Sequence, residues 1–277
     1  MIRSLLYVPA HSERFLAKAH ERGADAIILD LEDAVPPDAK DAARNGLTAA
    51  VAAVRRGGAR VLVRINSGER QVEDAVAACR AGADMLYVSK VRHPGELARL
   101  AEGLEPEEER SGGKRIQFIA LLEDIGAVLD ARSIATAPRL AGLSVGGEDL
   151  ALSMGAEPTP DVLRLPKLLV HYAAREHGLL SIGMLRSVAD FSDLAGIEAA
   201  AREANEHGFD GATCVHPAAV PVLNAAFSPS AEQRDWAQRV IAAASAGHGA
   251  FQIDGKMVDA PIIARARAIL TKSPPDA

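Results

Sequence analysis

The feature that most constrains the fold of this 277-residue chain is an eightfold alternation of short apolar runs with longer alanine-rich segments. Most runs are apolar on both faces, as expected for strands of a parallel sheet that helices cover. The segments between them have a helical period, and several end on glycine, the usual helix stop. The runs occupy residues 4–10, 26–32, 60–66, 85–90, 116–123, 140–146, 179–185 and 211–217.

A strand followed by a helix, repeated eight times over about 220 residues, predicts a (β/α)8 TIM barrel, an α/β fold. A doubly wound open sheet is the alternative, but "YVPAHSER" after the first run lacks the glycine-rich phosphate loop of that fold. We expect residues 1–227 to form the barrel catalytic domain and residues 228–277 a C-terminal helical extension and lid, in which "FQIDGKMVD" resembles a small hairpin. The acidic segment 102–115 is expected to be an exposed loop.

Composition excludes several classes of partner. The formal net charge is -6 with acids and bases interspersed, so no basic stripe for nucleic acid and no polybasic segment for a membrane is present. No run approaches the roughly 20 apolar residues of a membrane span, and the first residues do not resemble a signal peptide. Cys79 and Cys214 fit no metal spacing, which favours reduced thiols and a cytoplasmic location.

Polar residues follow nearly every predicted strand. In a barrel the active site lies at the carboxyl ends of the strands, where these residues would meet. Helix caps explain a few of them but not seven strands in succession. They are Asp30, Glu32 and Asp33; Arg64 and Asn66; Lys90; Glu123 and Asp124; Glu148 and Asp149; Arg186; and His216.

Glu123 and Asp149 follow consecutive strands, so a barrel brings their carboxylates close together. Like charges in a partly dry pocket repel unless a cation lies between them. With hard oxygen donors and no His or Cys at matching spacing, Mg²⁺ is the favoured metal. The alternative is that Asp149 only caps the next helix. Glu148 is expected to point away from its neighbour.

The remaining candidates each have two interpretations. Arg64 would bind a substrate carboxylate or thioester oxygen, or pair with an acid at the barrel mouth. Lys90 suggests a Schiff base but is better explained by an ion pair with the acidic cluster. His216 would be a general acid or a loop anchor. We also take Glu32 as a catalytic candidate, and Asp33, Lys90, Gly147 and His216 as candidates for substrate binding.

The chain resembles the citrate lyase β-subunit-like family, within the larger group of HpcH/HpaI aldolases. The resemblance is carried by the order and spacing of short motifs from residue 4 to about residue 270. They are "SLLYVPA", "LAKAHERGADAIILDLEDAVPP", "LVRIN", "LLED", "LSVGGEDLA", "HGFDG" with "VHP", and "GKMVDAPIIARARAIL".

This resemblance implies an enzyme that binds Mg²⁺ through Glu123 and Asp149 and makes or cleaves a carbon-carbon bond in a hydroxyacyl thioester of coenzyme A or a carrier protein. Citryl, malyl and citramalyl esters are the substrates it implies, with a short oxo acid as product. It also implies that Asp259, on a C-terminal lid of the adjacent subunit, is the catalytic base, and that the protein is a homo-oligomer, namely a trimer. The sequence alone favours another role for Asp259, because an Asp before Ala-Pro is a very good N-cap for the last helix.

Three departures from the family pattern bear on substrate recognition. After Glu123 the chain reads "DIGAV", where relatives often have Thr and Arg. At strand 7 it reads "GMLRSVADF", which differs from the pattern expected of a typical citryl-thioester enzyme. At strand 8 it reads "GATCVHP", where many relatives have Gly-Lys. Two alternatives to a thioester lyase therefore stay open. One is a metal-dependent aldolase acting on free 2-oxo or hydroxy acids, and the other is a non-catalytic metabolite-binding accessory subunit.

Overall fold

A computed structural model of the chain describes residues 1–245 and 251–272. The described residues divide into two compact units, one of residues 2–224 and one of Met1 with the described part of residues 225–277. No helix in the described ranges is long and apolar enough to cross a membrane.

The first unit is the predicted (β/α)8 barrel. Its eight strands are all parallel, and neighbours in the sheet follow chain order from β1 to β7, with β8 beside β1. A bridge between Ile182 and Gly211 closes the circle from β7 to β8. The strands are β1 (Ser4–Pro9), β2 (Ala26–Asp30), β3 (Arg60–Ile65), β4 (Met85–Val88), β5 (Gln117–Leu122), β6 (Leu140–Val145), β7 (Leu180–Ile182) and β8 (Ala212–Cys214).

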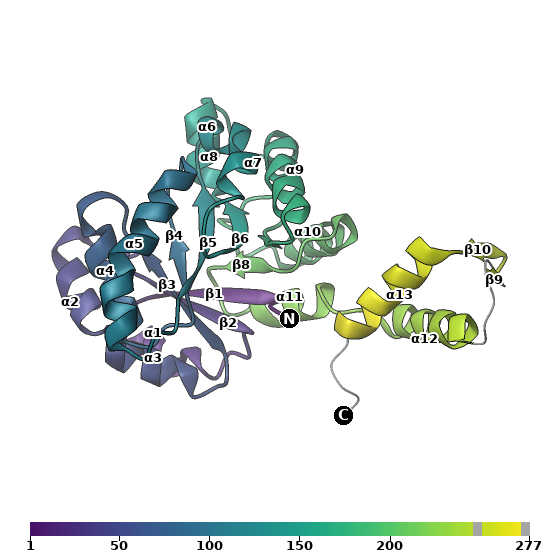
Figure 1. Ribbon diagram of the computed structural model, residues 1–277, viewed down its shortest axis with the longest axis horizontal. Helices are drawn as coiled ribbons and strands as arrows, with labels where there is room; N and C mark the ends of the chain where they lie inside the picture. Colours follow the sequence, from purple (N-terminus) through teal and green to yellow (C-terminus); the bar gives the residue numbers. More distant parts are fainter. Residues whose placement is uncertain (246–250, 273–277) are drawn as a thin grey trace. The chain divides into compact units, whose positions relative to one another are not determined.

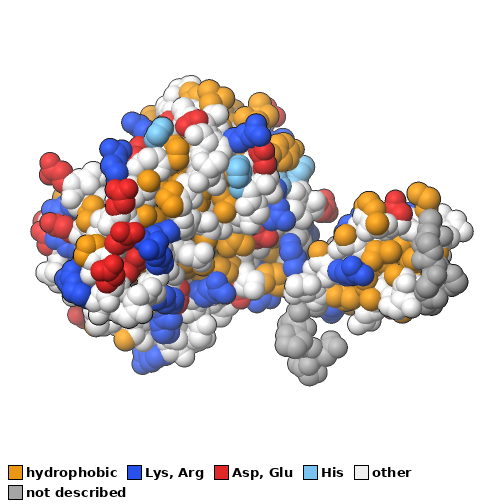
Figure 2. All heavy atoms as spheres, in the orientation of Figure 1, with side chains coloured by type: hydrophobic (Ala, Val, Ile, Leu, Met, Phe, Trp, Pro, Cys, Tyr) orange, Lys and Arg blue, Asp and Glu red, His pale blue; other side chains and the backbone are white. Residues whose placement is uncertain are grey.

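Helices surround these strands (Figure 1). Because helices cover their outer faces, β2 and β4 are buried at every residue, which explains why these runs are apolar throughout. The helices are α1 (Glu13–Ala19), α2 (Lys40–Asn45), α3 (Leu47–Arg55), α4 (Gln71–Arg80), α5 (Pro94–Arg110), α6 (Ile125–Leu129), α7 (Ala131–Ile134), α8 (Gly147–Met154), α9 (Pro160–Glu176), α10 (Leu194–His207) and α11 (Ala219–Ala226), with 3₁₀ turns at Pro37–Ala39 and Gly68–Arg70. Acidic and basic side chains are mixed over the face of this unit seen in Figure 2.

The expectation of an exposed loop at residues 102–115 is wrong, because α5 continues to Arg110. Two acids of this segment, Glu107 and Glu108, are buried. Each has an arginine partner: Arg80 Nη2 lies 2.8 Å from Glu107, and Arg139 Nη1 lies 2.7 Å from Glu108. Cations from other elements make burial of these carboxylates possible, and a charge run alone does not reveal such partners.

Alternate residues of the strands fill the centre of the barrel, as the period of two along a strand requires. This core contains Leu5, Ile28, Leu62, Met85, Tyr87, Ile119 and Leu121 among others. The next inward positions towards the carboxyl ends, two residues further on, are Asp30, Arg64 and Glu123. The register that packs the core therefore also directs these charged side chains to the barrel mouth.

The second unit contains α12 (Ala231–Ser245), an antiparallel hairpin of β9 (Phe251–Ile253) and β10 (Lys256–Val258), and α13 (Ala260–Lys272). The hairpin confirms the interpretation of "FQIDGKMVD". Asp254 and Gly255 turn it, both with positive φ, as two-residue hairpin loops require. The two helices pack through a small core that includes Ala237, Val240, Val258 and Ala266.

Candidate functional site

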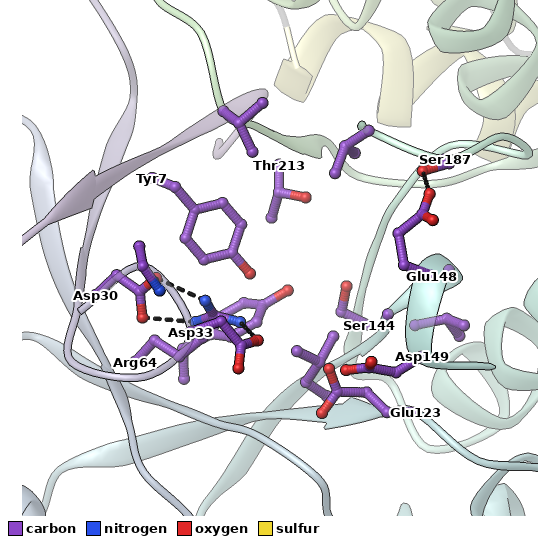
Figure 3. A pocket seen from close by; sticks show the side chains of 18 of the residues that line it. Tyr7, Asp30, Asp33, Arg64, Glu123, Ser144, Glu148, Asp149, Ser187 and Thr213 are labelled. Atoms are coloured by element: carbon purple, nitrogen blue, oxygen red, sulfur yellow. Dashed lines mark hydrogen bonds and ion pairs between the residues drawn. The ribbon is translucent and has the colours of Figure 1, made fainter. Parts of the chain in front are cut away.

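A cavity of about 430 Å³ lies at the carboxyl ends of the barrel strands. Its lining includes five of the predicted site residues, namely Asp33, Arg64, Glu123, Gly147 and Asp149. Figure 3 shows Asp30, Asp33 and Arg64 on one side and Glu123 with Asp149 on the other. The barrel therefore brings Asp30 and Asp149, which are 119 positions apart in the chain, to the same cavity.

Glu123 is held deep in this cavity by backbone geometry. The residue is 6 % exposed, and Oε2 accepts a hydrogen bond of 2.7 Å from the backbone N–H of Lys90. Lys90 has a positive φ of 56°, a conformation that costs a non-glycine residue free energy and is concentrated at functional sites. Gly146 lies against the carboxyl, because a Cβ at that position would be 2.7 Å from Glu123 Cγ and Oε1.

The electrostatic environment of Glu123 disfavours its negative charge. Burial raises the pKa of Glu123 to about 8, and the charges of Glu32 and Asp149 contribute to the rise. Asp149 is in the first turn of α8, and its carboxylate lies beside that of Glu123 in Figure 3. A cation bound between the two carboxylates would remove this penalty.

The donor set fits one hard divalent cation. In the described ranges no group of three or more His, Cys, Asp or Glu side chains is arranged to hold a metal. Mg²⁺, however, commonly takes only one or two carboxylates from the protein and fills its other positions with water and substrate. Two oxygen ligands at the wall of an open cavity suit that kind of site.

Arg64 is paired with acids at the barrel mouth. Its Nε and Nη2 donate to the two carboxylate oxygens of Asp30 at 2.7 and 2.6 Å, and Nη1 lies 2.9 Å from Glu32 and 3.2 Å from Asp33. The guanidinium also lies over the ring of Tyr7, 5.1 Å from its centroid. Asp30 is almost fully buried, whereas Asp33 is 56 % exposed, so one face of this network is open to the cavity.

Glu32 and Lys90 are not among the residues that line the cavity. Lys90 Nζ is 2.9 Å from Glu32, which agrees with the ion-pair interpretation of this lysine. Burial raises the pKa of Glu32 although Arg64 and Lys90 both oppose the rise. This placement favours a role for Glu32 in holding two cations over direct contact with a substrate.

Glu148 points away from the pair, as expected. It is exposed and accepts a hydrogen bond from Ser187 Oγ in the loop between β7 and α10 (Figure 3). Asp124 caps α6 through a 2.9 Å bond from Ala127 N, so the cap explanation holds for this acid.

Lys167 is a cavity residue that the sequence analysis missed. It is 5 % exposed, and Nζ donates to the carbonyl oxygens of Met184 and Arg186 at 2.8 and 2.7 Å. Burial lowers the pKa of Lys167 to about 8. A signal was available, since Lys167 lies on the buried stripe of α9 with Leu163, Val170 and Ala174.

His216 lines a second cavity, of about 380 Å³, between β1, α1 and the end of β8. Its ring stacks on Phe191, and Nδ1 accepts a 3.2 Å bond from Ala218 N, which agrees with a loop anchor. Three basic residues of α1 and the turn after it, Arg14, Lys18 and Arg22, line the same cavity. Tyr7, Pro9 and Val215 line both cavities, so the two adjoin.

Asp259 belongs to the second unit and is half-buried. It lies just before α13, where Oδ1 accepts a long bond of 3.5 Å from Ile262 N and the backbone carbonyl accepts one of 3.0 Å from Ile263 N. The cap predicted from the sequence is therefore present. A catalytic role for Asp259 stays a prediction.

Comparison with known proteins shows which family the chain resembles. A model of the family described as HpcH/HpaI aldolase/citrate lyase matches residues 3–217. A (3S)-malyl-CoA thioesterase of Cereibacter sphaeroides is 36 % identical, covering 98 % of this chain and 94 % of that protein. A citrate lyase subunit beta-like protein of Mycobacterium tuberculosis is 33 % identical over 97 % of this chain and 94 % of its own.

Solved structures give the same result. The protein CitE from Mycobacterium tuberculosis, in complex with magnesium, acetoacetate and coenzyme A, matches with a TM-score of 0.80 and 31 % identity, covering 98 % of this chain and 97 % of that one. A citrate lyase from Burkholderia xenovorans, with a TM-score of 0.85 and 22 % identity over 98 % of this chain and 91 % of that one, supports the fold alone.

Proposed function

This chain belongs to the HpcH/HpaI aldolase/citrate lyase family, and on that premise we propose that it is a Mg²⁺-dependent carbon-carbon lyase of hydroxyacyl thioesters. The substrate is of the malyl-, citramalyl- or citryl-CoA type, and the products are a short oxo acid and an acyl thioester. The observation that carries the proposal is the buried Glu123 beside the half-buried Asp149 in a cavity large enough for such an acyl group.

Glu123 and Asp149 would hold the metal. Bound there, Mg²⁺ supplies a Lewis acid that polarises the substrate hydroxyl or carbonyl and favours the charge that develops during cleavage. The structure of CitE, a relative with the same fold, contains magnesium together with acetoacetate and coenzyme A. This supports Mg²⁺ as the metal.

Arg64 would stabilise negative charge on the thioester oxygen. Its guanidinium is fixed by two bonds to the carboxylate of Asp30, which orients it before substrate arrives. The exposed Asp33 is the partner that a substrate anion can replace with least reorganisation. Gly147 lets the substrate approach the backbone at the start of α8, since it has no side chain in the cavity wall.

The second cavity would receive the polyanionic part of coenzyme A. Arg14, Lys18 and Arg22 offer three positive charges beside the barrel mouth, whereas the barrel mouth itself is rich in carboxylates. Phosphate groups are bound well by such cations. Tyr7 and Val215 line both cavities, so the cavity proposed for coenzyme A adjoins the one that contains the metal pair.

A base must accept the hydroxyl proton, and Asp259 is our candidate. We propose that it acts on the cavity of an adjacent subunit in a homotrimer, as the resemblance implies. Size-exclusion chromatography with light scattering tests the trimer, and mixed oligomers of R64K and D259N chains test the shared site: activity should return on mixing two inactive variants.

The function is tested by incubating purified protein with malyl-CoA, citramalyl-CoA and citryl-CoA, with and without Mg²⁺. We expect one of these esters to release its oxo acid, glyoxylate, pyruvate or oxaloacetate, only with Mg²⁺. Cleavage of a free hydroxy acid in preference to its ester would instead indicate the aldolase. Binding of metal and coenzyme A without turnover of any ester would indicate the accessory subunit.

Hydrolysis of the thioester is a second candidate, favoured by the 36 % identity to proteins named (3S)-malyl-CoA thioesterase. The products separate the two reactions. A lyase acting on malyl-CoA forms glyoxylate and acetyl-CoA, whereas a thioesterase forms malate and the free thiol of coenzyme A, which a thiol reagent detects.

A further inference from the structure

Lys167 is a buried cation to which the proposed reaction assigns no step. It comes from α9, and the residue is 5 % exposed. In the part of the chain that the structure describes, Nζ forms no ion pair within 4 Å, and Glu148 is the acid whose charge acts on it from further away. Since burying an ammonium is costly, what Lys167 contacts should indicate what it does.

The partners of Lys167 are two carbonyl oxygens of one loop. Nζ donates to Met184 and Arg186, at the start of the segment between β7 and α10. The residues that follow, Ser187 and Val188, form part of the cavity wall. Lys167 therefore fixes the backbone from which this wall projects.

Lys167 also packs against the turn that carries a metal-ligand candidate. Nζ lies 3.7 Å from the position that a Cβ on Gly147 would occupy. Two residues later in the same turn is Asp149, and between them Glu148 accepts a bond from Ser187 of the loop (Figure 3). Glu148 thus bonds the loop to the first turn of α8, and Lys167, which bonds the loop, lies close to the same turn.

We propose that Lys167 is a positioning residue that sets acyl selectivity, by holding the wall formed by Ser187 and Val188 at a fixed distance from the turn that carries Asp149. The inference rests on the proposed function in that the acyl group occupies this cavity. Displacement of the wall changes the space available to the acyl group without touching the metal pair. The burial that lowers the pKa of Lys167 agrees with an ammonium enclosed between the two segments.

The test uses full-length K167M and K167Q, with R164M as control. Arg164 is one turn away on α9, is 43 % exposed and pairs with Glu203 at the surface. Malyl-CoA and citramalyl-CoA differ by one methyl group, and a methyl in a pocket is worth roughly 10-fold or more in kcat/KM. We expect K167M to change the ratio of kcat/KM for these two esters by at least about 5-fold, mainly through KM.

The Kd of Mg²⁺ should stay within about 2-fold, since Lys167 does not touch the metal pair. Amide hydrogen exchange at residues 184–188 should become faster in K167M and stay unchanged in R164M. K167Q keeps N–H donors without the charge, so its kcat/KM ratio and its exchange rates should fall between those of wild type and K167M. If K167M does not fold, K167Q alone tests the proposal.

An unchanged selectivity ratio together with unchanged exchange at residues 184–188 would overturn the proposal. Failure of the proposed function gives a different result. In that case wild type turns over neither ester, while the exchange of residues 184–188 in the two Lys167 variants still shows whether Lys167 holds the loop.

Discussion

Replacing Glu123 by glutamine measures what it costs the fold to keep this carboxyl buried beside other acids. The rise of its pKa from 4.5 to about 8 corresponds to about 5 kcal/mol, at about 1.4 kcal/mol for each pKa unit. Glutamine is nearly isosteric and retains an oxygen that can accept the bond from Lys90 N. E123Q should therefore be more stable than wild type in the absence of metal, by as much as about 5 kcal/mol at alkaline pH.

The dependence on pH has a definite sign. Because the pKa is higher in the folded protein, the folded state binds this proton more tightly than the unfolded state does. Below about pH 4.5 the carboxyl is protonated in both the folded and the unfolded state, and the unfolding free energy of wild type has its full value. This stability is lost as pH rises towards 8. The difference in unfolding free energy between E123Q and wild type should be small at pH 5 and reach its full value above pH 8.

Urea unfolding followed by circular dichroism at pH 5, 7 and 8.5, with chelator present, measures this difference. Mg²⁺ should reduce the stability difference between E123Q and wild type, since a ligand at 100 times its Kd stabilises wild type by about 2.7 kcal/mol and has no site in E123Q. A difference that stays constant within about 1 kcal/mol from pH 5 to 8.5 would refute the argument from burial and like charge.

Three further predictions follow from individual contacts. In G146A the new Cβ would lie 2.7 Å from Glu123, so the Mg²⁺ affinity measured by calorimetry should fall at least about 10-fold. The control G103A, whose new Cβ would make an ordinary contact of 3.5 Å, should bind Mg²⁺ as wild type does. D259N keeps a good N-cap and should retain the melting temperature while losing turnover, whereas D259A should lose about 1 kcal/mol of stability as well; equal activity of D259N and wild type would leave Asp259 a cap only. The apparent Mg²⁺ affinity should strengthen up to about 10-fold per pH unit until pH 8, because binding displaces the proton on Glu123, and titration calorimetry in two buffers should detect that released proton.

The fold could be predicted from the sequence because each element buries a continuous stripe. Both faces of the barrel strands are covered, so their runs are apolar throughout, and the repeat of strand and helix has few other solutions. The exception is the segment at Glu107 and Glu108, where burial depends on Arg80 and Arg139 from other elements. Sequence periodicity contains no information about such partners.

The site was predictable in outline for a related reason. The two-residue period that points Leu62 into the core also points Arg64 into the mouth, and the same holds for Glu123 after Leu121. Finer features depend on tertiary structure. The positive φ of Lys90, which aims its N–H at Glu123, and the carbonyl partners of Lys167 become visible only once strands and loops from distant parts of the chain meet.

The account depends on one hard cation between Glu123 and Asp149. A crystal grown with Mn²⁺, which shares the oxygen-rich octahedral coordination of Mg²⁺ and scatters anomalously, tests this directly. We predict an anomalous peak at the wall of the barrel cavity, within coordination distance of one carboxylate oxygen of each residue. A map without a peak there, or with the two carboxylates turned apart at full Mn²⁺ concentration, would contradict the account.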